Sequence, residues 1–293
     1  MSTDRPALAL PTAGPDPLPW DTALAAVLGY ARGRRSLRYR SPIEREGRWV
    51  QVAAFGYERF DCRPVPTGPL GDDDVLVAEG LHGRLDPDGW CAVRRALDDV
   101  QARAEAVTAH AAGRPFWELP DDELSVLGEP GTVGAALRDL GEPPDPHDRY
   151  VVAALHHRRP ELVPLVTRTT WLQALPHLRE GDSGIAAVLH RELRANATAF
   201  AALEEAAAEL LTHPLTRLRL HDLLLWLTAT LRLPAAVALG QDTEEWLRST
   251  AGRAPSTPDR SGQEGGVQPG SRPVIPSSRS STGASSGTGT TGP

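Results

Sequence analysis

The sequence predicts a mainly α-helical protein: an irregular multi-helix bundle with at most a short β-strand or hairpin near residues 48–56. Two observations carry this prediction. Apolar residues recur three and four positions apart through most of the chain, which is the period of an amphipathic helix. Several of these stretches begin with a capping residue followed by proline, a common start of a helix. Eight or more helices of unequal length are therefore expected.

Three elements are expected in the first eighty residues. Pro19 and Asp21 precede an apolar run with helical spacing, so a helix begins there. Residues 48–56 (RWVQVAAFG) form the one β-like run, a short strand or one arm of a hairpin. Gly71 and the acidic residues 72–74 then open a short helix, because acidic side chains favour the positive end of the helix dipole.

The strongest predicted helix starts at Asp86, has Pro87 at its first helical position and ends at Gly113. Its apolar stripe is spaced for packing on another helix. The stripe consists of Trp90, Val93, Leu97, Val100, Ala104 and Val107. Phe116 follows and is expected to plug the core beside this helix.

The second half repeats the same logic after two short helices expected at residues 120–127 and 132–140. Asp145, followed by proline, opens a further helix. A short helix is expected over residues 168–178, and one long helix over residues 185–210 with its cap at residue 182 or 183.

Two more helices complete the body. Pro214 opens a helix that runs through Leu227 and is apolar on most sides, so it is expected to be the central one. Asp242 and Glu245 form an Asx version of the capping box in front of a last helix.

The folded body is expected to be a single all-α domain over residues 20–249. Residues 1–19 contain five prolines, and residues 250–293 are rich in Ser, Thr, Gly and Pro with little apolar surface to bury. Such segments cannot offset the entropy lost on ordering, so both are expected to be disordered.

The chain contains 31 arginines and no lysine. This excludes mechanisms that need a lysine, such as a P-loop or a Schiff base, since the high pKa of arginine prevents it from acting as a base. Net charge is −7, but residues 30–63 hold nine arginines against four acidic residues, whereas residues 71–145 hold seventeen acidic residues against six arginines. This asymmetry either marks a surface that faces a polyanion or reflects two halves of one domain that neutralise each other.

No feature of the sequence directs the chain to a membrane or an oxidising compartment. Cys62 and Cys91 are read as ordinary thiols, with one bridge between them as the alternative. Neither a signal peptide nor a membrane-spanning run is present, so a cytoplasmic, lysine-free protein with no membrane partner is expected.

The run from His156 to Arg159 is the most conspicuous polar cluster. At the end of a predicted helix its cations favour the helix dipole, which explains it without a function. The functional alternative is a phosphate-contacting patch, since the guanidinium fork fits phosphate oxygens.

A metal, cofactor or catalytic site is not indicated by any motif. The nine histidines lack the spacing of metal ligands, and no Gly-x-Ser-x-Gly or Gly-rich phosphate loop occurs. Adjacent His221 and Asp222 are interpreted as a satisfied core pair. An enzyme is still possible if its site is assembled only in three dimensions, for instance from His147, His156 or His190.

The segment 154–168, ALHHRRPELVPLVTR, resembles the core of an uncharacterised, mostly actinobacterial family, domain-of-unknown-function family six-three-zero-eight. The matching positions are Leu155, Arg158, Arg159, Pro160, Leu162, Val163, Pro164 and Leu165. Four other stretches fall in the family's order, and the similarity covers residues 55–231. These stretches are residues 55–60, 73–78, 116–119 and 220–227.

The central pattern of that family is in turn similar to the glycosylase branch of the helix-hairpin-helix proteins. There a Gly-rich hairpin grips DNA phosphate and a following Asp assists catalysis. Here the hairpin glycines would fall near residues 145–147, none of which is Gly, and the Asp position falls on Thr167. The resemblance therefore implies a member without glycosylase chemistry.

The function that these observations favour is a non-catalytic binding or interaction module with an unknown, possible protein partner. The first alternative is a degenerate nucleic-acid-binding domain that uses Arg158, Arg159 and Arg168, together with the basic stretch 32–40. The second alternative is an enzyme whose site is not visible in the sequence.

Overall fold

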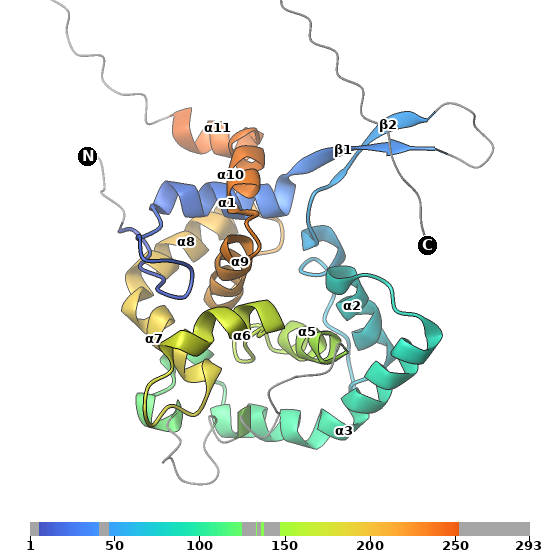
Figure 1. Ribbon diagram of the computed structural model, residues 1–293, viewed down its shortest axis with the longest axis vertical. Coiled ribbons are helices and arrows are strands. Elements are labelled where there is room, and N and C mark those ends of the chain that lie inside the picture. The colour runs from blue at the N-terminus through green and yellow to red at the C-terminus, as the bar shows by residue number, and fades with distance from the viewer. Residues whose placement is uncertain (1–5, 41–46, 125–132, 134–135, 138–146, 252–293) are drawn as a thin grey trace, which may run out of the picture. The chain divides into compact units, whose positions relative to one another are not determined.

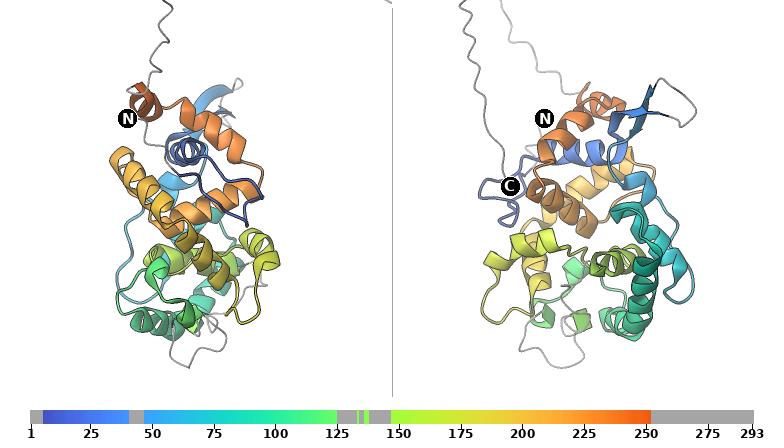
Figure 2. Two further views of the ribbon diagram at one scale, coloured as in Figure 1. Left: turned by 90° about the vertical axis from the view of Figure 1, so that its left-hand side faces the viewer. Right: turned by 45° about the vertical axis from the view of Figure 1, so that its right-hand side comes forward.

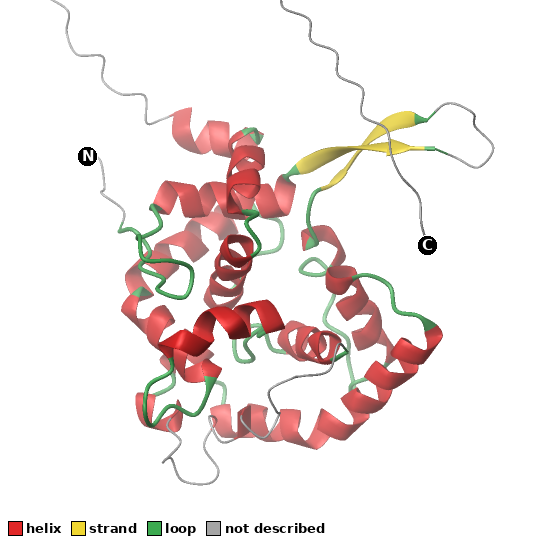
Figure 3. Ribbon diagram, in the orientation of Figure 1, coloured by secondary structure: helices red, strands yellow, loops and turns green. Residues whose placement is uncertain are grey.

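Helices dominate the structure, as the spacing of apolar residues predicts, and a two-stranded antiparallel sheet accompanies them (Figure 1, Figure 3). The structure, a computed structural model, describes residues 6–40, 47–124, 133, 136, 137 and 147–251. The expected tail, except for residues 250 and 251, lies outside these residues. So do most of the helix expected at 132–140 and the cap expected at Asp145.

The elements of the first half are α1 (Trp20–Arg32), β1 (Arg34–Tyr39), β2 (Arg48–Ala53), α2 (Asp72–His82) and α3 (Pro87–Ala111). Short 3-10 turns occur at Tyr57–Arg59, Phe116–Glu118 and Asp121–Leu124.

The elements of the second half are α5 (Asp148–Arg158), α6 (Arg168–Ala174), α7 (Ile185–Ala195), α8 (Ala197–Leu210), α9 (Arg217–Ala229), α10 (Leu233–Gln241) and α11 (Glu244–Ala251). A 3-10 turn, Leu175–His177, extends α6, so the helix expected over residues 168–178 is confirmed.

Helix α3 begins and ends where the sequence predicts. The Asp86 side chain accepts a hydrogen bond from the Gly89 N–H at 2.7 Å, which satisfies one of the free amides at the helix start. At the other end Ala112 adopts a left-handed conformation with φ of 50°. The stripe is buried at Val93 and Leu97, and the expected plug Phe116 has no exposed surface.

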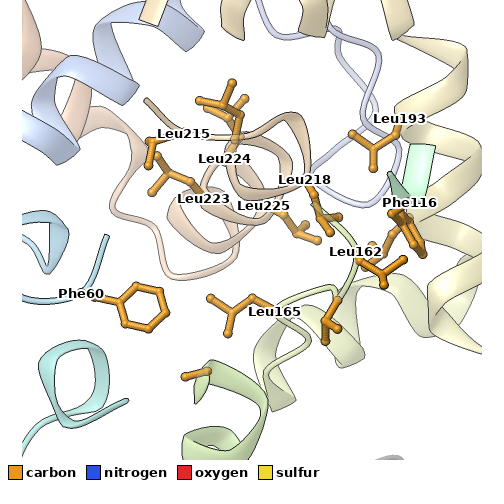
Figure 4. Close-up of a cluster of buried hydrophobic side chains, with 14 of the residues drawn as sticks. Phe60, Phe116, Leu162, Leu165, Leu193, Leu215, Leu218, Leu223, Leu224 and Leu225 are labelled. Atoms are coloured by element: carbon orange, nitrogen blue, oxygen red, sulfur yellow. The ribbon is translucent and has the colours of Figure 1, made fainter. Parts of the chain in front are cut away.

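Helix α9 is the central helix, as its composition predicts. From Leu218 to Leu227 every residue except the half-buried Trp226 is buried, on every side of the helix. Figure 4 shows its leucines between side chains from several other segments, among them Phe60, Leu165 and Leu193. Within the described residues no single helix is long and apolar enough to span a bilayer; α9 and α10 pass that test only as a pair, and they are bent by 116°.

The long helix expected over residues 185–210 is two helices, α7 and α8, which meet at Asn196. Its φ and ψ of −109° and 22° are not helical. The Asn196 side chain instead accepts a hydrogen bond from the Ala9 N–H and donates to the Ala9 carbonyl oxygen, each at 2.8 Å. Its Nδ2 also donates to the Glu192 carbonyl oxygen at 2.8 Å; asparagine competes with the helix through such contacts to nearby backbone, which explains the break.

These hydrogen bonds also correct the expected disorder of residues 1–19, because residues 6–19 are packed onto the body. Leu8 and Leu10 are buried, and the backbone of Leu8 pairs with that of Leu18 at 2.8 Å in both directions. The prolines predict disorder, but the burial of Leu8 and Leu10 and the hydrogen bonds between Ala9 and Asn196 order the segment.

Helix α10 was not predicted from the sequence. It crosses α1 at Gly29 and Gly240. A Cβ atom on Gly240 would lie 1.8 Å from the Ala25 carbonyl oxygen, and one on Gly29 would lie 1.8 Å from the carbonyl oxygen of Ala236. The two helix backbones therefore touch, and a side chain at either glycine would force them apart. Figure 2 shows α10 lying across α1.

Replacing Gly240 by alanine should lower the free energy of unfolding by about 3 kcal/mol or more, because backbone atoms cannot move aside as a flexible side chain can. Chemical denaturation of the purified variant measures this. Gly56→Ala is the matched control, since the closest atom to its Cβ would be a Leu81 methyl at 3.4 Å, an ordinary contact, and its φ of −90° suits alanine. Equal stability of the two variants would contradict the close crossing.

Candidate functional site

Arg158, in the last turn of α5, uses every donor of its guanidinium inside the protein. Nε and Nη2 donate to the two carboxylate oxygens of Asp74 at 2.5 and 2.7 Å. Nη1 donates to the carbonyl oxygens of Pro66 and Gly68, at 2.5 and 2.9 Å, and Nη2 donates to that of Pro69 at 3.1 Å. Its five N–H groups therefore match five acceptors, which leaves none for a phosphate.

The prediction that Arg158 contacts nucleic acid is therefore corrected. Asp74 is buried at the start of α2, so Arg158 ties α5 to α2 and to the loop before it. Breaking such a pair costs stability because it leaves a buried charge without a partner. The other two predicted residues are exposed: Arg159 at the end of α5, where its Nη1 donates to the Arg158 carbonyl oxygen, and Arg168 at the start of α6.

His156 and His157 are buried rather than presented to a ligand. His156 Nδ1 lies 2.7 Å from the Val163 carbonyl oxygen, and His157 Nε2 lies 3.1 Å from that of Arg63. Burial lowers the pKa of His156 to about 3 and lowers that of His157. Both imidazoles are therefore neutral at neutral pH and belong to the core.

The first turns of α9 bring three buried polar side chains into the protein centre. The first, Arg219, forms an ion pair with Asp61, with Nε 2.7 Å from Oδ1 and both side chains 5% exposed. The Tyr30 hydroxyl donates to Asp61 at 2.5 Å and accepts from Arg219 at 2.7 Å. The guanidinium also lies over the ring of Phe60, 5.3 Å from its centroid. The nearby carboxylate raises the pKa of Arg219 although burial opposes this, so the group stays charged.

The second polar side chain of α9, His221, pairs with Glu192 of α7 rather than with Asp222. His221 Nε2 lies 2.8 Å from Glu192 Oε2, which also accepts from the Thr12 hydroxyl at 2.6 Å, while Glu192 Oε1 accepts from the Thr12 N–H at 2.8 Å. Burial alone would raise the pKa of Glu192, but these hydrogen bonds lower it. His221 therefore pairs with Glu192 and not, as predicted, with Asp222. The same carboxylate holds the N-terminal segment through Thr12.

The third, Asp222, accepts from the Leu165 N–H at 3.0 Å, and the same oxygen lies 3.9 Å from His156 Nδ1. Its other carboxylate oxygen has no hydrogen-bond partner among the described residues. Burial raises the pKa of Asp222 from 3.8 to about 6, against the attraction of Arg219.

The histidines proposed for a hidden catalytic site are not brought together. His190 is buried on α7 with Nε2 2.8 Å from the Leu119 carbonyl oxygen, and His156 has a different carbonyl partner. His147 precedes α5 and is half-buried. In the part of the chain that the structure describes, no group of three or more His, Cys, Asp or Glu side chains is arranged to hold a metal ion.

An open hollow of about 360 Å3 lies beside the N-terminal segment. Leu10, Pro11, Pro15 and Pro17 line it together with His177, and its wall is mostly apolar. One imidazole is the only titratable side chain in this lining, so the hollow does not supply an acid–base pair.

The antiparallel hairpin β1–β2 is the most exposed element of the described chain. Every residue of β1 is exposed, and Figure 1 shows the two strands extending away from the helices. Its base is held where the Ala54 N–H donates to the Gly33 carbonyl oxygen at 2.9 Å and where Arg34 pairs with Glu58 at 2.6 Å. A two-stranded hairpin of this kind has little stability of its own, so its exposure calls for an explanation.

The two strands carry four arginines and no acidic residue, and the register distributes them over both faces. On one face Arg38 lies opposite Trp49, and Ser36 opposite Gln51. On the other face Tyr39 lies opposite Arg48, whose guanidinium is 5.9 Å from the tyrosine ring centroid. The same face also carries Leu37, Val50 and Val52. The hairpin is thus a ribbon of arginine and aromatic side chains.

The expected β-like run is confirmed as β2, whereas β1 was read only as part of the basic stretch 32–40. Arg32, the first residue of that stretch, ends α1 and lies 3.7 Å from Glu245. The sequence did offer a signal for β1, because a basic run lies only a few residues before the strand-like run. Arginines on both faces hid the alternation that marks a half-buried strand.

Comparisons with protein-family models, with curated proteins and with solved structures give no match for this chain. The resemblance to domain-of-unknown-function family six-three-zero-eight and the more distant one to helix-hairpin-helix glycosylases stay predictions.

The stability of the protein should fall on acidification, and Asp222 should oppose that fall. Between about pH 4 and 6 the folded chain holds a proton on Asp222 that the unfolded chain has released, so the stability this group contributes is fully present below about pH 4 and lost as pH rises through 6. His156 and His82, whose pKa values burial lowers to about 3 and about 4, act in the opposite direction.

Asp222→Asn should therefore lose stability more steeply than the wild type as pH falls from about 6.5 to 4.5. Asparagine keeps an acceptor for the Leu165 N–H but cannot take up the proton. Urea unfolding at several pH values measures the two slopes. Parallel profiles for variant and wild type would show that Asp222 does not titrate in this range.

Proposed function

We propose that this protein is a non-catalytic binding protein that contacts nucleic acid through the hairpin β1–β2. The observation that supports the proposal is the combination of Arg35, Arg38 and Arg48 with Trp49 and Tyr39 on one exposed ribbon without an acidic side chain. Arginine forks bind phosphate oxygens, and exposed aromatic rings stack on bases.

The charge distribution of the chain supports a local rather than a general attraction. With a net charge of −7 the protein as a whole repels a polyanion, and three adjacent aspartates begin α2. A ligand that carries phosphates is therefore directed to a restricted basic surface. The hairpin is such a surface, because three of the four arginines on its strands form no ion pair with another described residue.

A binding role also fits the organisation of the buried charges. Arg219, His221 and Asp222 each have a partner inside the protein, and their contacts join segments of the fold rather than line an open cavity. We therefore assign no catalytic residue. Arg159 directly follows α5 and Arg168 begins α6, both outside the hairpin, and the proposal does not require them.

Replacing Arg35 and Arg38 together by glutamine should weaken nucleic-acid binding by about tenfold or more at low salt, because two phosphate contacts are lost. The slope of log affinity against log salt should fall in magnitude by about 1.4 for a single strand. Fluorescence anisotropy with labelled oligonucleotides, single-stranded and duplex, measures both quantities.

The matched control is Arg95→Gln with Arg103→Gln on α3, which changes the net charge equally and lies apart from the hairpin in the ribbon views (Figure 1, Figure 2). It should bind as the wild type does. The proposal fails if the wild type shows no salt-sensitive binding at micromolar concentration, or if the control loses as much affinity as the hairpin variant.

A further inference from the structure

Trp49 is unusually exposed for its size. Its exposed fraction is 69%, and among the large apolar side chains of the described chain only Leu231 is more exposed. An indole ring in water lacks the stabilisation that burial would give it. The position of an exposed tryptophan on a strand is therefore better explained by a function than by a contribution to folding. The rest of the tryptophans in the described residues are buried or half-buried.

The register places Trp49 beside groups that fit a nucleic-acid strand. Arg38 lies directly opposite on the same face, and Ser36 and Gln51 lie next along it, joined by a hydrogen bond of 2.9 Å. All four side chains are exposed. This face therefore offers one aromatic platform, one phosphate-binding guanidinium and two hydrogen-bonding groups.

The opposite face also carries the exposed Arg35, but its aromatic ring is less suited to stacking. Its aromatic ring, Tyr39, is 46% exposed and already has the guanidinium of Arg48 near it. Val50 and Val52 on this face are half-buried. A base that approached it would meet a ring that is already in contact with a cation.

A flat ring can stack only on a base whose own face is free. In a duplex each base face is covered by its neighbours, and the grooves present base edges alone. Unpaired bases offer their faces, and stacking on an aromatic side chain depends little on the sequence. The geometry of the hairpin thus distinguishes between the two forms of nucleic acid.

We propose that the hairpin prefers single-stranded nucleic acid and that Trp49 is its base-stacking residue, with Arg38 holding the adjacent phosphate. This inference rests on the proposed function and narrows it to one class of ligand. DNA and RNA single strands share the chemistry that Trp49 and Arg38 recognise, so the inference covers both.

Trp49→Ala should bind oligo-dT and oligo-U about tenfold or more weakly than the wild type, because one stacked base is lost. Trp49→Phe should keep most of the affinity, and Tyr39→Ala on the opposite face is the positional control with a smaller effect. The slope of affinity against salt should not change in any of these variants, since no charge is removed. A duplex of mixed sequence should bind more weakly than its separate strands.

Fluorescence gives a second readout that a mere change in folding would not produce. Oligo-dT should quench the wild type more than Trp49→Phe, and the difference reports on this one ring among seven tryptophans. The inference is overturned if Trp49→Ala binds single strands as the wild type does, or if the duplex binds as tightly as the strands. Those results would leave arginine-dependent binding intact, whereas absence of all binding would overturn the proposed function itself.

Discussion

The fold depends on keeping the charged and polar side chains of α9 partnered in the protein centre. A buried charge without a partner costs several kcal/mol, so a helix that is enclosed on all sides can carry Arg219 only if a carboxylate is buried with it. Asp61 supplies that carboxylate, Glu192 pairs with His221, and a backbone amide at Leu165 reaches Asp222. These partners come from separate segments of the chain, so the polar contacts determine which segments meet at α9.

Around this centre, further hydrogen bonds and ion pairs of polar side chains order segments that have little apolar surface. Glu192 and Asn196 hold the N-terminal segment at Thr12 and Ala9, and Arg158 holds the loop before α2. Each contact adds to the burial of the few apolar side chains in these segments, such as Leu8 and Leu10. A chain that has arginine as its only long cation suits this plan, because a guanidinium can satisfy several acceptors at once while a lysine ammonium cannot match a planar fork. The arginines of the hairpin differ from these partnered ones, since three of them face outward.

The helices could be predicted from the sequence where local signals agree. Asp86 with Pro87 located α3, and the run of leucines after Pro214 identified α9 as central. The predictions failed where a contact between residues far apart in the sequence determines the local structure. Asn196 breaks a helix because Ala9 meets it, 187 positions away. For the same reason Arg158 looked like a phosphate ligand, since nothing in its neighbourhood along the chain reveals Asp74. Strand β1 became visible only when paired with β2, which also put Arg38 beside Trp49.

The most direct test of the central role of α9 is a double-mutant cycle on Arg219 and Asp61, measured by chemical denaturation. Arg219→Met and Asp61→Asn should each lower the free energy of unfolding by about 3–5 kcal/mol, since each leaves a buried partner unsatisfied. The double variant should lose clearly less than the two losses added together, by about 2 kcal/mol or more. Small, additive losses of less than about 1 kcal/mol each would contradict this account, because they would mean that the pair does not hold α9 in place.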